Sequence, residues 1–138
     1  CCLLWVLAFA GAAALVIYFA LGSWTVICFG DEGVACGFAA RADFGAAYMP
    51  DGRVVVVAGR DSEQNFGDVW VGRAESGGFE LLDASAPFGP RHGHSLLVSS
   101  AGLHLLGGDS AGVGNDTSRF LNDVWSSTDG ATWVLQTA

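Results

Sequence analysis

The first thirty residues of the chain carry no charged side chain, and the next two residues are Asp31 and Glu32. As a helix, an apolar run of this length would reach about 45 Å, against a hydrocarbon core of about 30 Å in a bilayer. Trp5 and Trp24 are spaced so that each indole would lie near one membrane–water interface. The pattern therefore predicts a single transmembrane helix over residues 1–30.

Two other interpretations of this apolar segment are weighed against a spanning helix. A cleavable signal peptide has an apolar stretch of about 7–15 residues after a basic start, whereas this run is longer and contains no basic residue. A buried helix of a soluble core seldom needs more than about 14 uninterrupted apolar residues. Length and flanks favour the spanning helix.

Small residues gather in the first half of the predicted helix. In lipid, small side chains let a neighbouring helix approach closely, although alanine and glycine are also simply frequent in this chain. The predicted packing interface consists of Ala8, Gly11, Ala12 and Ala14. Because the segment contains no histidine, we expect no intrinsic cofactor, and any pigment or lipid would be contacted laterally.

Beyond a linker at residues 31–40, the sequence repeats itself with a period of about fifty residues. Each unit contains an arginine, a turn, a short apolar run, a glycine-containing pair, an Asp-Val-Trp triplet and a second aromatic residue. The first unit (41–90) has Arg41, 50–52, 54–57, 58–59, 68–70 and Phe79; the second (91–138) has Arg91, 101–102, 103–106, 107–108, 123–125 and Trp133. Short apolar runs between turn residues predict strands, four in each unit.

The second unit resembles a kelch repeat. The residues that carry the resemblance are Arg91, Gly107, Gly108, Trp125 and Trp133. The first unit resembles a degraded repeat, with Ala58 in place of the first glycine and Phe79 in place of the second tryptophan. The resemblance implies two four-stranded antiparallel blades. A closed propeller needs at least about four blades, so two units would form an incomplete propeller whose open faces need further sequence or another protein.

Charge and composition narrow the choice of partners. The chain has 138 residues and a net charge of −8, and all six basic residues are arginine. An acidic, lysine-free surface argues against a nucleic-acid partner. The acidic flank after the apolar segment also disfavours a cytoplasmic location for the repeats, which places them on the lumenal or extracellular side.

The sequence offers little for catalysis. His92 and His94 would present two metal ligands from one strand, but no third ligand lies at a usable spacing, and packing of His94 within the repeat is the favoured alternative. No serine elbow, phosphate-binding loop or paired catalytic carboxylates are found, so we expect a non-enzyme without a resident metal. The aspartates at turns and strand starts are predicted to bind nearby backbone amides: Asp51, Asp61, Asp68, Asp109, Asp123 and Asp129.

The sequence suggests two covalent modifications, a disulfide bond and an N-linked glycan. Cys28 and Cys36 flank the predicted membrane exit and would pair in an oxidising compartment, with two free buried thiols as the alternative. Asn115 begins an Asn-Asp-Thr glycosylation sequon, which matters only if its loop faces the secretory lumen or the cell exterior.

Together these features predict a non-enzymatic, single-pass membrane accessory subunit. Its helix would pack against other membrane subunits in the bilayer, and its repeats would cover a lumenal or extracellular surface of a larger complex, such as a photosystem with its antenna or a respiratory supercomplex. The alternative is a fragment of a membrane-anchored cell-surface kelch receptor or carbohydrate-binding protein.

Overall fold

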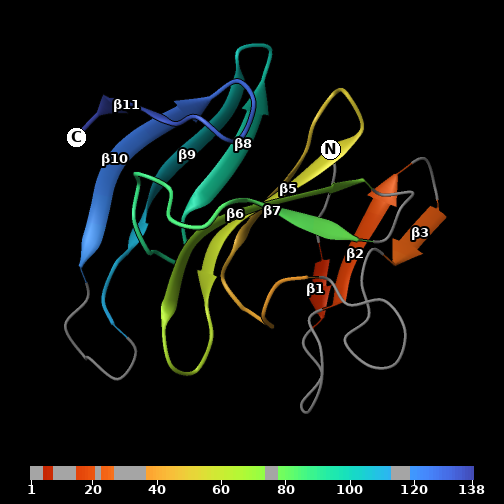
Figure 1. The fold of residues 1–138 in the computed structure, drawn as a ribbon, viewed down its shortest axis with the longest axis horizontal. Helices are drawn as coiled ribbons and strands as arrows, with labels where there is room; N and C mark the ends of the chain where they lie inside the picture. The colour runs from red at the N-terminus through yellow and green to blue at the C-terminus, as the bar shows by residue number, and fades with distance from the viewer. Residues whose placement is uncertain (1–4, 8–14, 21–22, 27–36, 74–77, 113–118) are drawn as a thin grey trace.

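The computed structural model describes residues 5–7, 15–20, 23–26, 37–73, 78–112 and 119–138, and these residues form three antiparallel sheets (Figure 1). Two of the sheets have four strands each and follow one another along the chain. No residue among those described is helical. The prediction that the repeat region is all-β, with two four-stranded antiparallel sheets, is therefore confirmed.

Each four-stranded sheet is a simple meander in which every strand pairs with the next one in sequence. The strands of the first sheet are β4 (Gly45–Tyr48), β5 (Arg53–Arg60), β6 (Asn65–Arg73) and β7 (Phe79–Asp83). Those of the second sheet are β8 (Ser95–Ser99), β9 (Gly102–Asp109), β10 (Phe120–Ser127) and β11 (Val134–Thr137). Gly52 lies in the turn between β4 and β5, and Gly102 is the first residue of β9, directly after the turn that follows β8. Both have positive φ, as the turn residues predicted.

The described parts of the apolar N-terminal segment are strands: β1 (Trp5–Leu7), β2 (Leu15–Ala20) and β3 (Ser23–Val26), in the order β1-β2-β3. The structure does not support the helix predicted over residues 1–30. An uninterrupted apolar run has no period that separates a helix from a buried strand. The Val, Ile, Tyr and Phe side chains of β2 favour strands.

The remaining predictions for this segment cannot be followed further. Trp5 and Trp24 lie on β1 and β3, so the helical spacing that assigned them to the two membrane interfaces does not apply. Ala8, Gly11, Ala12, Ala14, Cys28 and Cys36 lie outside the described residues. The described part of the chain contains no helix of the length and hydropathy needed to span a membrane.

The core of the repeat region lies between the two four-stranded sheets. Val55 and Val57 of β5 point into it from the first sheet, and Leu103 and Leu105 of β9 point into it from the second; all four are fully buried. Because successive side chains of a strand point to opposite faces, the intervening Val54 and Val56 enter a second cluster on the other side of the first sheet. The run at residues 54–57 is thus buried on both faces.

The connection between the sheets is fixed by backbone hydrogen bonds. The amide of Ala86 donates to the carbonyl of Gly67 at 2.8 Å, and the amide of Arg91 donates to the carbonyl of Phe66 at 3.0 Å. The carbonyl of Arg91 accepts from the amide of Gly59 at 2.9 Å. The segment that leads into the second unit is therefore hydrogen-bonded to the inner ends of β5 and β6.

The glycine pair of the second unit and the alanine–glycine pair at the corresponding positions of the first unit share a backbone conformation with positive φ. Gly107 and Gly108 have φ values of 60° and 109°, and Ala58 and Gly59 have φ values of 54° and 101°. A Cβ atom on Gly107 would lie 2.8 Å from the carbonyl oxygen of Leu121. We expect Gly107→Ala to lower the free energy of unfolding by about 1–3 kcal/mol, through this clash and the strained φ.

The matched control for this prediction is Ala58→Gly. That change relieves a strained φ but removes a fully buried methyl group, so we expect a net effect within about 1 kcal/mol. Urea denaturation of both variants against the parent chain measures the difference. Equal losses in the two variants would contradict the expected asymmetry.

Candidate functional site: a duplicated arginine network and an open sheet face

The second unit is built around a buried arginine. Arg91 is 2% exposed, and its two terminal nitrogens donate to the two carboxylate oxygens of Asp123 at 2.7 and 2.9 Å. The same guanidinium donates to the carbonyl of Gly107 at 2.9 Å and to the carbonyl of Phe88. The indole N–H of Trp125 donates to Asp123 at 2.7 Å. A planar guanidinium suits this fork-to-fork arrangement, which ties the lead-in segment, the glycine pair and β10 together.

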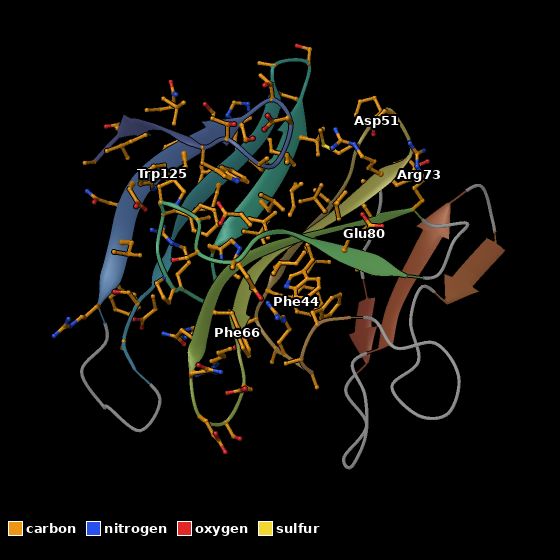
Figure 2. All side chains as sticks on the ribbon, in the orientation of Figure 1. Phe44, Asp51, Phe66, Arg73, Glu80 and Trp125 are labelled. Carbon is orange, nitrogen blue, oxygen red and sulfur yellow. The ribbon has the colours of Figure 1, made fainter. Side chains whose placement is uncertain are left out.

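The first unit repeats the bonds of this network to the aspartate, the tryptophan and the glycine-pair carbonyl. Arg41 donates from its two terminal nitrogens to the two carboxylate oxygens of Asp68, and to the carbonyl of Ala58 at 3.0 Å. The indole N–H of Trp70 donates to Asp68 at 2.6 Å. The Arg41 guanidinium also lies 4.0 Å from the ring centre of Phe66, which Figure 2 labels. The sequence repeat is therefore also a repeat of three-dimensional contacts.

These arginine–aspartate pairs are structural. Hydrogen bonds from Arg91, followed by that from Trp125, hold the pKa of Asp123 below its ordinary value, although burial opposes them. A carboxylate kept ionised in this way accepts hydrogen bonds and is a poor general acid at neutral pH. Asp68 and Asp123 thus depart from the prediction that they bind nearby backbone amides, because each pairs with an arginine about thirty residues earlier.

Four other aspartates do what the sequence predicts. Asp51 accepts from the amide of Arg53 and Asp61 from those of Glu63 and Gln64. Asp109 accepts from the amides of Ala111 and Arg119. Asp129 accepts from the amides of Ala131 and Thr132, and the Thr132 bond is the largest cause of its lowered pKa. This turn delivers Trp133, whose indole N–H donates to the carbonyl of Gly130, into the core.

The two candidate metal-ligating histidines do not converge. Nδ1 of His92 lies 3.1 Å from Oδ1 of Asn65, whereas His94 is buried and neither of its ring nitrogens has a hydrogen-bond partner. A Cβ atom on Gly45 would lie 2.6 Å from Nε2 of His94, so the ring occupies space left by a glycine. Among the described residues no group of three or more His, Cys, Asp or Glu side chains is placed to hold a metal ion.

The burial of His94 has an electrostatic consequence. Loss of water around the ring, followed by the positive charge of Arg91, lowers the pKa of His94 to about 4. The contribution of the Val57 backbone opposes this shift only in part. His94 is therefore neutral at physiological pH and packs as an apolar ring, as Phe44 does at the corresponding position of the first unit.

A shallow depression of about 280 Å³ lies at one end of the first sheet, lined by Arg53, Val71, Gly72, Arg73, Gly78 and Glu80. Figure 2 shows Asp51, Arg73 and Glu80 around this end. Arg53 pairs with Asp51 at 2.7 Å and donates to the carbonyl of Asp129 at 3.0 Å. Because Arg53 already binds groups of the chain itself, the depression offers a weak site for an anionic ligand.

Three of the exposed large apolar side chains, Leu97, Leu106 and Val134, lie on one face of the second sheet. Strand register places Leu97, His104, Ser126 and Val134 in one row across all four strands, and Ser95, Leu106 and Val124 in the next. We call these seven residues the open face. Leu97 is 55% exposed and Val134 54%. No feature of the sequence marked these residues, because a strand pattern does not tell which face finds a partner.

The corresponding face of the first sheet is covered. Its row contains Ala47, Val55 and Val71, and all three lie in the core against the second sheet. The opposite face of each sheet carries the tryptophan: the row is Ala46, Val56, Trp70 and Leu81 in the first sheet and Leu96, Leu105, Trp125 and Leu135 in the second. We call these the tryptophan faces. The second sheet thus uses its tryptophan face to cover the first.

The kelch signature residues Arg91, Gly107, Gly108, Trp125 and Trp133 are brought together around this core, whereas Asn115 lies outside the described residues. Comparison with models of known protein families finds no match for the chain, and a search of curated proteins finds no similar sequence. The kelch resemblance therefore stays a prediction from the sequence motifs.

Proposed function

We propose that the chain is a non-enzymatic accessory subunit of a larger protein complex, with its two kelch-like units as the docking part. The observation that carries the proposal is the open face. Exposed apolar side chains that gather on one face of a sheet mark a contact surface. Leu97, Leu106 and Val134 are exposed on this face, and His104 and Ser126 lie between Leu97 and Val134. The equivalent face of the first sheet is the main contact between the units.

The side chains that the sequence offers for catalysis already have partners, or are buried, within the described residues. The aspartates that the sequence offered are engaged by arginines or turn amides. The histidines are separated, and His94 is deeply buried.

The membrane part of the proposal rests on the uncharged composition of residues 1–30. We propose that this segment contacts lipid or membrane subunits on the lumenal or extracellular side of a bioenergetic complex, such as a photosystem with its antenna or a respiratory supercomplex. Membrane contact of this kind needs no spanning helix, because an apolar segment buried among other subunits serves equally.

Fractionation of gently solubilised native membranes tests the proposal. We expect the parent chain to migrate with a large complex, and the Leu97→Asp variant to move to the free fraction, because a charge on the open face would be buried without a partner. Phe120→Asp is the control: Phe120 is 82% exposed and is not one of the open-face residues, so this variant should stay in the complex.

Migration of the parent chain as a free monomer would refute the accessory-subunit proposal. It would instead favour the alternative of a cell-surface kelch receptor or carbohydrate-binding protein, which needs no permanent neighbours.

A further inference from the structure

We infer that the open face pairs with the open face of a second copy of this chain, so that two copies form a symmetric dimer. The inference deepens the proposed function and rests on its premise that the open face is a docking surface. It names the partner from the pattern of polar and apolar side chains on that face, because this pattern is complementary to itself.

The first row of the open face has the same order of side-chain types from either edge of the second sheet. The edge strands β8 and β11 (Figure 1) contribute the apolar Leu97 and Val134, and the inner strands β9 and β10 contribute the polar His104 and Ser126. Leu97 and Val134 are each more than half exposed. The row is therefore apolar at both edges, where its side chains are accessible to a partner, and polar in the middle.

The second row has the opposite pattern with the same symmetry. Its inner strands contribute the apolar Leu106 and Val124, and β8 contributes the polar Ser95. On β11 the register shifts beside Val124, and Gln136 directs its side-chain amide to Oγ of Ser126 at 2.9 Å. The second row is therefore polar at both edges and apolar in the middle.

A two-fold axis that runs along the strands, midway between β9 and β10, matches both rows of two copies at once. When two sheets pack face to face about this axis, β8 lies over β11 of the second copy and β9 lies over its β10. Leu97 then contacts Val134 of the second copy, and His104 contacts its Ser126, each at two equivalent places. An axis that runs across the strands matches at most one of the two rows. The order of side chains therefore selects one symmetric arrangement.

Charge also favours contact between like copies at this face. The chain has fourteen acidic residues and a net charge of −8, so two copies repel one another. None of the seven open-face residues is acidic, and none is an arginine. The open face therefore lets two copies meet without placing one acidic side chain against another.

The size of the open face sets the expected strength of the contact. The face spans the four strands of one sheet, and neighbouring strands lie about 4.8 Å apart. A face of this width is small beside the roughly 800 Å² that each partner buries in a standard protein–protein interface. We therefore expect a reversible dimer whose population rises with protein concentration.

Light scattering on the purified full chain in a mild detergent, over a range of protein concentrations, tests the inference. We expect the parent chain to pass from monomer to dimer as the concentration rises. Leu97→Asp should raise the dissociation constant at least about 100-fold, about tenfold for each of the two equivalent contacts, because a carboxylate would face Val134 of the second copy. Phe120→Asp changes a residue outside the open face and should dimerise as the parent does. Circular dichroism checks that each variant is folded.

A pair of complementary variants tests the direction of the two-fold axis. Val134→Arg alone should weaken the dimer as Leu97→Asp does, and it replaces that variant if Leu97→Asp fails to fold. An equimolar mixture of the two should form a one-to-one heterodimer at concentrations where each alone is monomeric. One contact of the heterodimer pairs the introduced carboxylate with the introduced guanidinium, and the other keeps Leu97 against Val134.

A parent chain that stays monomeric at every concentration overturns the inference. So does a Leu97→Asp variant that dimerises as the parent does, or a mixture of the complementary variants that forms no heterodimer. Each of these outcomes leaves the proposed function standing if the chain still migrates with other proteins in native membranes. Dimers that contain only this chain in those membranes would support the pairing of open faces and remove the accessory-subunit proposal.

Discussion

Replacing Arg91 by alanine should lower the free energy of unfolding by about 3–5 kcal/mol, the cost typical of removing one partner from a buried ion pair. Arg91 is almost fully buried and contacts Asp123 and the carbonyls of Gly107 and Phe88. Without the guanidinium, a carboxylate and two carbonyls lose their charged donor. Because small proteins are stable by only about 5–15 kcal/mol, this single change would remove much of the stability of the repeat region.

The matched control is Arg60→Ala. Arg60 pairs with Asp43 at 2.8 Å, but both side chains are close to half exposed, and exposed pairs contribute about 0–1 kcal/mol. Urea denaturation of both variants measures the difference. If Arg91→Ala fails to fold, Arg91→Lys keeps the charge but loses the two-pronged contact, and should still unfold at lower urea than Arg60→Ala. Similar losses for the Arg91 and Arg60 variants would show that the buried network is not the anchor of the second unit.

The parts of the fold that the sequence predicts are those with local causes. Turn residues near Gly52 and Gly102 and the apolar runs between them predict the strand order, and both four-stranded sheets follow it. The fifty-residue offset between Arg41 and Arg91 predicts equivalent positions, and both arginines bond an aspartate and the first carbonyl of the glycine-containing pair. Local turn chemistry also predicts Asp129, whose bonds reach no further than Thr132.

The features that could not be predicted from the sequence depend on contacts between distant residues, or lie where the hydrophobic pattern has no clear period. The residues around Asp123 predict that its carboxylate binds nearby backbone amides, yet in the structure it pairs with Arg91. The apolar N-terminal segment has no charged residue and only Ser23 and Thr25 as small polar ones, so it shows no clear alternation. Length and flanks therefore favoured a helix, and the structure has strand β2 within the predicted span. The open face is invisible in the sequence because Leu97 and Leu96 look alike, and only the register shows that they lie on opposite faces.

Lowering the pH should destabilise the protein through His94 before its carboxylates respond. The pKa of His94 falls from 6.5 to about 4 on folding, so the unfolded chain binds the proton more tightly than the folded chain does. The stability is fully present above about pH 6.5 and is lost as the pH falls toward 4. A difference of this size corresponds to roughly 3 kcal/mol across the window. Asp123 and Asp129, whose pKa values lie below the ordinary 3.8, contribute only at lower pH.

Urea denaturation at several pH values between 7 and about 4 measures this dependence. His94→Phe is the matched variant, because the first unit has Phe44 at this position and a phenyl ring cannot be protonated. We expect its unfolding midpoint to change far less than that of the parent over this range. Parallel pH profiles for the two proteins would mean that the buried ring of His94 gains its proton without cost, and that the contact between the two sheets does not depend on its neutrality.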